Sequence, residues 1–409
     1  MRWRDYDPSK DQPAVRRIWQ ETGWLDEYPE RAMDCLLGAG RALVAKIGGE
    51  AECLVNSALG HMRYLNEELR FSGCTGVTTS RIARRQGFAR RLLARLIAAD
   101  VADGALVAGL GMFDQGFYDT LGFGTGTYDH WVAFDPAALK VNAAARVPQR
   151  LTTDDSTSMH ACRRARIRGH GALNFDSAAI TDAEWPVPKK GFALGYRDGP
   201  SGEITHHLSC VIEGAENGPY EIRWLAYRTK EQFLELMALM KGFADQVHVV
   251  RMNEPPGVQM QALLDRPFRL QSITEKSKYE NRISAYAGWQ MRICDLPGCL
   301  ERTHLPCGEV RFNLKLTDPI ERFLAEEKGW RGVGGDYVVT LGPSSGAERG
   351  ADPALPSLNA SVNAFTRLWL GVQPATGLAF TDDLSGPQEL LEALDAVLRL
   401  PEPMPDWGF

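Results

Sequence analysis

The order strand, turn, helix, strand near residues 68–112 constrains the fold of this chain more than any other feature. ELRFSGCTGVTT (68–79) is typical of a strand, and ARRQGFARRLLARLIAAD (83–100) is typical of an amphipathic helix. GALVAGLGM (104–112) is a short apolar run between turn residues, as expected for a buried strand. The apolar residues that share one helical face are Phe88, Leu92, Leu93, Leu96 and Ile97. This order predicts an α/β fold for the first third of the chain.

The junction between that strand and that helix, VTTSRIARRQGFAR (77–90), carries the pattern R-x-x-G-x-A at Arg84, Gly87 and Ala89. The first N–H groups of a helix have no internal partner, and the helix dipole adds partial positive charge there. Gly87 would let the backbone approach a phosphate closely, since no Cβ intervenes. With its additional arginines, the junction predicts a pyrophosphate-binding site. The alternative is an ordinary helix start with surface arginines.

A second copy of the pattern lies in ARIRGHGALN, where Arg166, Gly169 and Gly171 spell R-x-x-G-x-G. No strand is expected before this copy, and no apolar helix is expected after it. We therefore expect no cofactor site there.

The rest of the sequence indicates two further units. HWVAF (130–134) is expected to be the last strand of the first unit, and a linker follows near residue 141. Strand, helix and strand then recur at 220–229, 230–243 and 246–252. A third unit is expected from about residue 286. Its strands and helices are predicted at 288–294, 309–318, 336–343, 361–371 and 386–400.

Composition and charge narrow the class of protein. Of the 409 residues, 44% are hydrophobic and 24% are charged, as in a folded globular protein. The formal net charge of -6 argues against a nucleic-acid-binding protein, which would usually show a basic domain. No run approaches the roughly 18 apolar residues of a membrane span, and MRWRDYDPSK does not resemble a secretory signal. Eight scattered cysteines favour a reduced, cytoplasmic protein.

One group of potential metal ligands lies close together in the sequence: Cys294, Cys299, His304 and Cys307. Structural zinc sites usually open with a closer pair of cysteines. Buried thiols that act as small apolar residues are the better interpretation, and we expect no metal site.

Strand, phosphate-binding turn, amphipathic helix and buried strand, in this order, resemble the fold of the GCN5-related N-acetyltransferases (GNAT). In that family the turn holds the pyrophosphate of acetyl-CoA, and the strand before it bulges and faces the pantetheine arm. The next strand splays away and leaves a slot for the thioester. The resemblance implies cofactor contacts at Val77, Thr78, Thr79, Arg85, Gln86, Gly87, Phe88, Ala89, Arg90, Phe113 and Asp114.

The whole chain is similar to the enhanced intracellular survival (Eis) family of acetyltransferases. The matching pieces are the cradle at 84–90, GFYDTLGFG (116–124), WQMRICDLPGCLE (289–301), FTRLWLG (365–371) and the ending on Phe409. The resemblance implies two GNAT-like domains with mixed, splayed sheets, followed by a sterol-carrier-like α/β domain. These would span residues 1–140, 150–285 and 286–409, with acetyl-CoA bound by the first and no cofactor expected in the second. It also implies a homohexamer.

The same resemblance implies the catalytic groups. Tyr118, in FYDTLGF, would be the general acid, and the terminal carboxylate of Phe409 would be the general base. This sequence departs from the family pattern at Gln86, where relatives tend to be more basic. It also has Ser80-Arg81-Ile82 in place of the usual proline-containing turn.

The proposed chemistry suits the acid better than the base. A tyrosine with a pKa of about 10 can supply a proton to a departing thiolate with a pKa of about 8.5. An exposed terminal carboxylate, with a pKa of roughly 3.5, is a feeble base, and burial beside Trp407 would strengthen it. Three prolines, Pro401, Pro403 and Pro405, predict an extended tail that delivers the terminus to this site.

The expected acceptor is a primary amine, on an aminoglycoside or a lysine side chain, as the resemblance implies. WLDEYPE (24–30) combines acids with aromatic residues and could line a pocket for a polycation. A solvated loop with a few anchors explains the stretch equally well. A non-catalytic CoA-responsive scaffold and a lipid-binding protein are the alternative functions.

Overall fold

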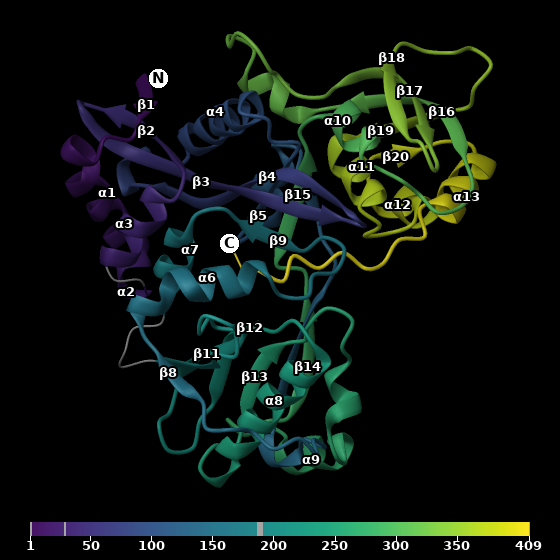
Figure 1. The fold of residues 1–409 in the computed structure, drawn as a ribbon. Helices are drawn as coiled ribbons and strands as arrows, with labels where there is room; N and C mark the ends of the chain where they lie inside the picture. The colour runs from purple at the N-terminus through teal and green to yellow at the C-terminus, as the bar shows by residue number, and fades with distance from the viewer. Residues whose placement is uncertain (1, 28–29, 186–190, 409) are drawn as a thin grey trace. The chain divides into compact units, whose positions relative to one another are not determined.

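The structure is a computed structural model that describes all residues except 1, 28–29, 186–190 and 409. The chain folds into two compact units (Figure 1). Unit 1 comprises Met1–Thr127, His170–Ser177 and Ala287–Phe409, and unit 2 comprises Tyr128–Gly169 and Ala178–Tyr286. The α/β fold class is confirmed, since every sheet is accompanied by helices.

The first sheet of unit 1 has the strand order β1-β2-β3-β4-β5-β15-β6, and β9 pairs with β3 beside this path. The described pairings are antiparallel except that of β4 with β5, which is parallel. The strands are β1 (Arg2–Asp5), β2 (Arg41–Ile47), β3 (Glu50–Tyr64), β4 (Glu67–Thr79), β5 (Val107–Gly111), β6 (Gly124–Thr125), β9 (Leu173–Phe175) and β15 (Trp289–Ile293).

Helices cover both faces of this sheet because successive strand residues point to opposite sides. In β3, Leu54 packs with α1 and α3, whereas Val55 packs with α4. The helices of this part are α1 (Pro8–Thr22), α2 (Trp24–Glu27), α3 (Glu30–Gly38), α4 (Phe88–Ala102) and α5 (Gln115–Asp119). The apolar face predicted for α4 is confirmed. Four of its five residues belong to one buried cluster, and the fifth, Phe88, packs against that cluster.

The C-terminal part of unit 1 has its own sheet, in the order β18-β17-β16-β19-β20. A fully buried ion pair at 2.6 Å, from Arg292 in β15 to Asp318, links it to the first sheet. Its strands are β16 (Val310–Thr317), β17 (Gly335–Leu341), β18 (Gly346–Arg349), β19 (Ser357–Ser361) and β20 (Leu384–Ser385). Its helices are α10 (Leu296–Glu301), α11 (Val362–Trp369), α12 (Ala375–Thr381) and α13 (Gln388–Val397).

Unit 2 is built on one sheet, in the order β14-β7-β13-β12-β11-β10-β8. Its strands are β7 (Asp129–Phe134), β8 (Gln149–Leu151), β10 (Gly191–Tyr196), β11 (His206–Ile212), β12 (Tyr220–Ala226), β13 (Val250–Asn253) and β14 (Arg282–Tyr286). Its helices are α6 (Ser156–Arg164), α7 (Ala178–Ala183), α8 (Lys230–Lys241) and α9 (Pro267–Thr274). The strand, helix and strand predicted between residues 220 and 252 are confirmed as β12, α8 and β13.

Two strands pair differently from the sequence-based expectation. HWVAF (130–134), expected in the first unit, lies in β7 and pairs with β13 and β14 of unit 2. The strand predicted at 288–294, expected to open the third unit, is β15, and it lies between β5 and β6 in the first sheet. An apolar run shows that a strand is buried but does not show which strand it pairs with. The division into three domains stays a prediction.

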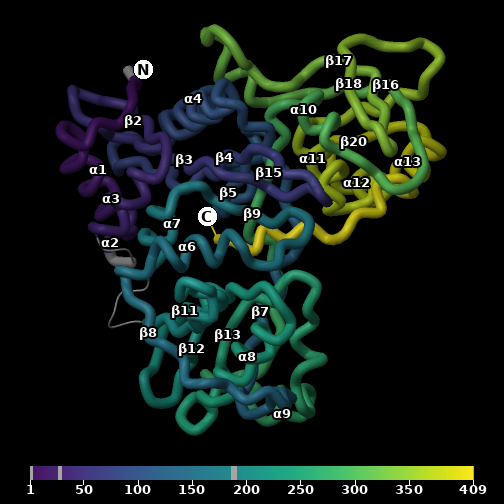
Figure 2. The backbone as a smooth tube through the Cα atoms, viewed as in Figure 1, coloured from purple at the N-terminus to yellow at the C-terminus, as the bar shows by residue number. Residues whose placement is uncertain are grey.

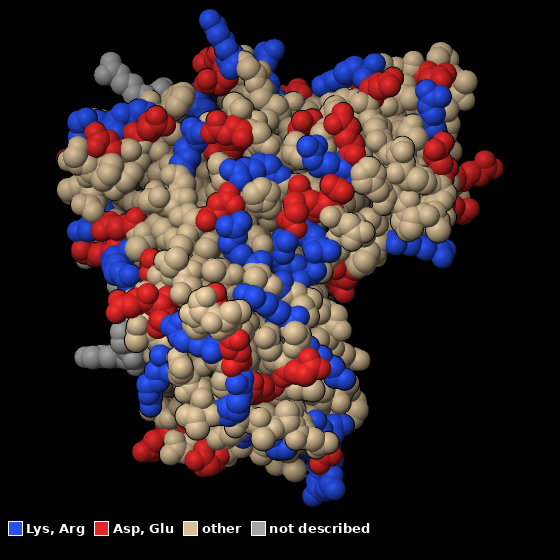
Figure 3. All heavy atoms as spheres, in the orientation of Figure 1, with Lys and Arg blue, Asp and Glu red and all other residues tan. Residues whose placement is uncertain are grey.

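The distribution of surface charge and the length of the helices bear on the expectations about nucleic-acid binding and membrane spans. Basic and acidic side chains are interspersed on the face drawn in Figure 3, as 46 basic and 52 acidic residues lead one to expect. Among the helices that the structure describes, none is both long and apolar enough to cross a membrane.

Candidate active site

The turn between β4 and α4 leaves the N-terminus of a helix open. Gly87 occupies the N-cap position with φ 77°, and Arg85 also has a positive φ, 61°. Because Gly87 has no side chain, it does not itself cap the first N–H groups of α4. Arg84 through Gly87 are exposed, and the Gln86 side-chain amide donates to the Ile82 carbonyl at 2.6 Å, which stabilises the turn. This geometry can bind an anion at the start of α4.

Beside this turn, β4 and β5 part. Their pairing runs from Phe71 with Val107 to Cys74 with Leu110, but β4 continues to Thr79. The register between β3 and β4 shifts between Asn56 and Ser57, so that Thr75 is an extra residue in β4. Such a bulge bends the strand and increases its local twist. The bulged strand and the separation of the next strand, both implied by the GNAT resemblance, are present.

Two of the three predicted β4 residues, Val77 and Thr79, have side chains that contact neighbouring residues of unit 1. Val77 packs against the cluster that includes α4, and the Thr79 hydroxyl lies 3.5 Å from the Cys53 thiol. Thr78 is 3% exposed, and its hydroxyl has no hydrogen-bond partner within the described part of the chain. Any contact of Val77 and Thr79 with a cofactor would therefore be made by backbone groups on the edge that faces away from β3.

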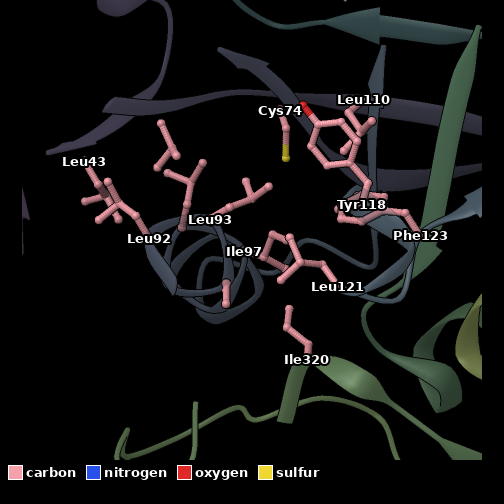
Figure 4. Close-up of a cluster of buried hydrophobic side chains, with 14 of the residues drawn as sticks. Leu43, Cys74, Leu92, Leu93, Ile97, Leu110, Tyr118, Leu121, Phe123 and Ile320 are labelled. Atoms are coloured by element: carbon pink, nitrogen blue, oxygen red, sulfur yellow. The ribbon is translucent and has the colours of Figure 1, made fainter. Parts of the chain in front are cut away.

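Tyr118 lies where the two strands part. It belongs to α5, immediately after β5, and its side chain is 3% exposed. Figure 4 shows the hydroxyl end of its ring directed toward Cys74, the last β4 residue that pairs with β5. Burial raises the pKa of Tyr118 well above its usual range, so the hydroxyl stays protonated at neutral pH. The geometry presents a proton donor at the separation.

The two predicted residues after β5 differ in their surroundings. Phe113 is 75% exposed, and its ring meets the Tyr118 ring edge-on at 5.7 Å. Asp114 is the N-cap of α5, where its carboxylate accepts from the Phe117 N–H at 3.3 Å. Asp114 therefore sets the start of the helix that carries Tyr118. Whether either residue contacts a cofactor stays a prediction.

Arg90 lies between the N-terminus of α4 and Tyr118, which it approaches through the Phe117 ring. It lies in the first turn of α4, and its guanidinium is 4.9 Å from the centre of the Phe117 ring. Phe117 packs edge-on against Tyr118, with ring centres 4.9 Å apart. The Arg90 Nε is buried and has no hydrogen-bond partner among the described residues. Sequence reasoning missed Phe117, although its place next to Tyr118 in FYDTLGF could have indicated it.

The C-terminal tail approaches the same sheet (Figure 2). Pro403 and Pro405 are buried, and Trp407 is only 3% exposed. The Trp407 ring packs edge-on against Phe175 of β9, at 5.6 Å. Phe409, the predicted base, lies outside the described residues.

The acidic, aromatic stretch WLDEYPE is described only in part. Trp24 is half-buried and packs edge-on against Trp19, at 4.9 Å. A Cβ built on Gly76 would lie 3.9 Å from the Trp24 ring, which places this ring next to the bulge in β4. The Asp26 and Glu27 side chains and Tyr28 lie outside the description. The substrate role of this stretch stays a prediction.

The second R-x-x-G-x-G copy has a different surrounding. Gly171 has φ 81°, and a Cβ there would lie 2.8 Å from the Met404 nitrogen, so this glycine allows the tail to pass closely. Cys294 and Cys299 are buried and Cys307 is exposed. Within the described ranges, no three His, Cys, Asp or Glu residues form a group that could hold a metal ion.

Comparisons with known proteins agree with this geometry. A family model described as an acetyltransferase (GNAT) domain matches residues 9–126. Solved structures that are similar over 100% of this chain include a GCN5-related N-acetyltransferase from Anabaena variabilis (TM-score 0.77, 13% identity, 100% of that chain), a probable N-acyltransferase from Enterococcus faecalis (0.76, 15%, 99%) and Eis1 from Mycobacterium abscessus (0.74, 15%, 100%). No curated protein sequence matches this one.

The family model and the site define the class of protein. The chain carries a GNAT acetyltransferase domain, for which acetyl-CoA is the cosubstrate, and it is an acyltransferase. The structural likeness to Eis1, at 15% identity, is a likeness of fold over the whole length of both chains.

Proposed function

We propose that the protein is an Eis-like N-acetyltransferase that transfers the acetyl group of acetyl-CoA to a primary amine. The observation that carries this proposal is the position of Tyr118, a buried and protonated hydroxyl at the point where β4 and β5 part. Tyr118 also belongs to the buried cluster that includes α4, so its ring is held in place beside this separation.

The first half of the site would bind the cosubstrate. The open N-terminus of α4 would hold the pyrophosphate, with charge supplied by Arg85 and Arg90. Arg90 suits this role because its Nε lacks a partner within the described structure. The edge of β4 from Gly76 to Thr79, which β5 does not cover, would offer its backbone groups to the pantetheine arm.

The second half would carry the chemistry. The neutral amine attacks the thioester carbonyl carbon, a C–N bond forms, and the C–S bond then breaks. Tyr118 gives its proton to the departing thiolate, and the amine proton passes to the carboxylate of Phe409, directly or through water. Backbone N–H groups at the strand separation would stabilise the oxyanion. The products are an amide and the free thiol of CoA.

The resemblance to the Eis family supplies the finer details. We propose an aminoglycoside or a lysine side chain as the acceptor, a sterol-carrier-like fold for the last part of the chain, a homohexamer, and a cytoplasmic location. The half-buried Trp24 beside the bulge in β4 supports an acceptor site near this ring, and we propose that the acids and aromatics of WLDEYPE bind a polycation there.

A thiol-release assay tests the proposal. Purified protein is incubated with acetyl-CoA and a panel of amines that contains aminoglycosides, polyamines and lysine peptides. We expect release of free CoA with at least one acceptor, and a loss of about 100-fold in kcat for Tyr118→Phe at unchanged acetyl-CoA affinity. Tyr220→Phe in unit 2 is the matched control, since its hydroxyl donates to the Ala215 carbonyl at 3.0 Å and lies outside the proposed site. Equal activity of Tyr118→Phe and wild type would remove the acid assignment.

A further inference from the structure

The turn that follows Tyr118 is tied to Tyr118 by its own backbone. It comprises residues 119–123 and lies between α5 and β6. The Leu121 and Phe123 N–H groups both donate to the Tyr118 carbonyl, at 2.8 and 3.4 Å. Both residues also belong to the buried cluster of Tyr118 (Figure 4), and the Phe123 ring meets the Tyr118 ring edge-on at 6.3 Å. A shift of this turn would therefore move the tyrosine.

Backbone carbonyls of this turn accept hydrogen bonds from a distant part of unit 1. The Asn363 side-chain amide in α11 donates to two of them, to the Asp119 carbonyl at 3.0 Å and to the Phe123 carbonyl at 2.7 Å. The Arg292 guanidinium of β15 donates to the Leu121 carbonyl between them. Asn363 lies about 240 residues further along the chain than the turn. A single amide thus joins the first and the last residue of the turn.

Two glycines allow this close approach. A Cβ on Gly124 would lie 2.5 Å from the Asn363 backbone oxygen, and one on Gly122 would lie 2.8 Å from an Arg292 nitrogen. Gly122 also has φ 86°, a conformation that favours glycine. The glycines of TLGFG (120–124) therefore leave room for α11 and Arg292 beside the turn.

Asn363 is not needed to start its own helix. Ser361 is the N-cap of α11, and its hydroxyl accepts from the Ala364 N–H at 3.3 Å. Asn363 is the second residue of the helix and is half-buried. Because Ser361 already caps the helix, the Asn363 amide is available to brace the turn.

We infer that Asn363 is a positioning residue for catalysis, which holds the turn after α5 and thereby keeps the Tyr118 hydroxyl where β4 and β5 part. This inference rests on the proposed function, because it takes Tyr118 as the acid. The acid must lie within hydrogen-bond reach of the departing sulfur. A displacement of about 1 Å at a reacting group can cost on the order of 100-fold in rate. The C-terminal part of unit 1 would thus act on the chemistry through α11.

The first test measures the steady-state kinetics of two variants of the full-length protein. Asn363→Leu nearly keeps the size of the side chain but removes both donors. Asn363→Asp places acceptors opposite the two carbonyls, and a carboxylate suits the first turn of a helix, so this variant should keep α11 folded. We expect each variant to lower kcat about tenfold while the KM for acetyl-CoA changes by less than about twofold. Unchanged kcat in both would overturn the inference.

Asn313→Leu is the matched control for the loss of a bridging amide. The Asn313 side-chain amide in β16 also donates to two backbone carbonyls, of Asp352 at 2.8 Å and of Leu355 at 3.0 Å. Its side-chain oxygen accepts in addition from the Asp352 N–H at 2.8 Å, so its loss should destabilise unit 1 at least as much. We expect kcat of Asn313→Leu to equal that of wild type. An equal fall in kcat in the Asn363 and Asn313 variants would overturn the inference.

A double-mutant cycle with Tyr118→Phe shows whether Asn363 acts through the tyrosine hydroxyl. In Tyr118→Phe, Asn363→Leu should lower kcat by less than about twofold, because the group that it positions is already gone. Equal losses in both backgrounds would overturn the inference and leave Tyr118 as the acid. If Tyr118→Phe alone were as active as wild type, the proposed function would lose its acid, and the catalytic part of the inference would be wrong with it.

The last measurement follows the turn itself and needs no catalytic activity. Hydrogen exchange at the Leu121 and Phe123 amides reports the two bonds to the Tyr118 carbonyl. We expect Asn363→Leu to accelerate exchange at both amides, and Asn313→Leu to leave both as in wild type. Unchanged exchange in Asn363→Leu would overturn the inference, because the amide would then not hold the turn.

Discussion

The chain contains the same local architecture twice, and the two copies differ at two places. In unit 1, β4 leads through α4 to a parallel β5. In unit 2, β12 leads through α8 to a parallel β13, whose described pairing ends after Glu221 and Arg251. Both central strands have an extra residue, Thr75 in β4 and Arg223 in β12. Bulge and strand separation are therefore properties of the fold rather than of the cofactor site.

The first difference between the two copies lies in the turn that precedes the helix. Residues 80–87 connect β4 to α4 and end on Gly87. Only residues 227–229 connect β12 to α8, and they end on Thr229, whose side chain accepts from the Gln232 N–H at 3.3 Å. The Gln232 side chain in turn accepts from the Arg228 N–H at 2.8 Å. The second helix thus caps its own N-terminus, whereas the first leaves it available to an anion.

A second contrast lies on the strands opposite these bulges. Two residues before the register shift, β3 has Leu54 and β11 has His207, and both are fully buried. Leu54 packs in an apolar cluster. His207 has no hydrogen-bond partner for either ring nitrogen among the residues described, and burial lowers its pKa to about 3. Unit 2 therefore holds a neutral histidine where unit 1 holds a leucine.

The largest expected effect concerns this histidine. Its pKa is lowered on folding, so between about pH 6.5 and pH 3 the unfolded chain binds the extra proton and stability falls as the pH falls. From pH 7 to pH 5 His207 should cost about 2 kcal/mol of the free energy of unfolding of unit 2. His207→Leu should remove this share of the pH dependence, as measured by urea unfolding at the two pH values. If the free energy of unfolding of His207→Leu changed with pH as much as that of wild type, the low pKa of His207 would be contradicted.

His170 of unit 1 is the internal comparison for this experiment. Burial lowers its pKa to about 4, while its Nε2 is 3.0 Å from the Leu370 carbonyl and its Nδ1 accepts from the Leu65 N–H at 3.1 Å. Because both nitrogens have partners, replacing His170 should destabilise unit 1 at every pH. His207→Leu should not destabilise unit 2 at pH 7, since it removes buried polar atoms without partners.

An effect of similar size, on cofactor affinity rather than on stability, is expected at the start of α4. Gly87→Glu places a carboxylate beside the proposed pyrophosphate and forces a side chain into a left-handed conformation. We expect acetyl-CoA affinity, measured calorimetrically, to fall about 30-fold, or about 2 kcal/mol. Thr229→Glu at the α8 start is the matched control, and it should change the affinity by less than about twofold. Similar losses from both substitutions would break the distinction between the two turns.

The smallest effect is expected when the side-chain cap at the start of α8 is removed. Thr229→Ala removes the side-chain cap of α8 and should lower stability by about 1 kcal/mol, measured by denaturant unfolding. Acetyl-CoA affinity should stay as in wild type. A loss of affinity would mean that the start of α8 takes part in cofactor binding. That result would contradict the assignment of cofactor binding to the uncapped start of α4 alone.

Local features were predictable from the sequence, and distant pairings were not. The apolar face of α4 and the turn at Gly87 follow from spacing and residue type, because a helix is specified by its own residues. The place of β15 between β5 and β6 could not be predicted, since its partners lie about 180 residues (β5) and about 165 residues (β6) away in the chain. The burial of His207 likewise depends on packing, since its ring meets the Trp224 ring of β12 edge-on at 6.4 Å.

In the candidate site, too, a residue with a local motif was predictable and a residue defined by distant contacts was not. Tyr118 was identified by its motif, and the structure places it beside the strand separation. Phe175 was missed because nothing in LNF indicates that the segment would leave unit 2 and support the tail. Aromatic residues in a short strand are common, and only their contacts show what they position.

The place of β15 also determines when the enzyme can be completed during synthesis. Its residues leave the ribosome only after all of unit 2, so β5 has no partner on that edge while the intervening chain is made. An unpaired strand edge is a template for wrong pairing. The catalytic sheet of this protein is thus closed by a late-arriving strand, and a nascent chain must keep an open sheet edge protected until about residue 293 has emerged.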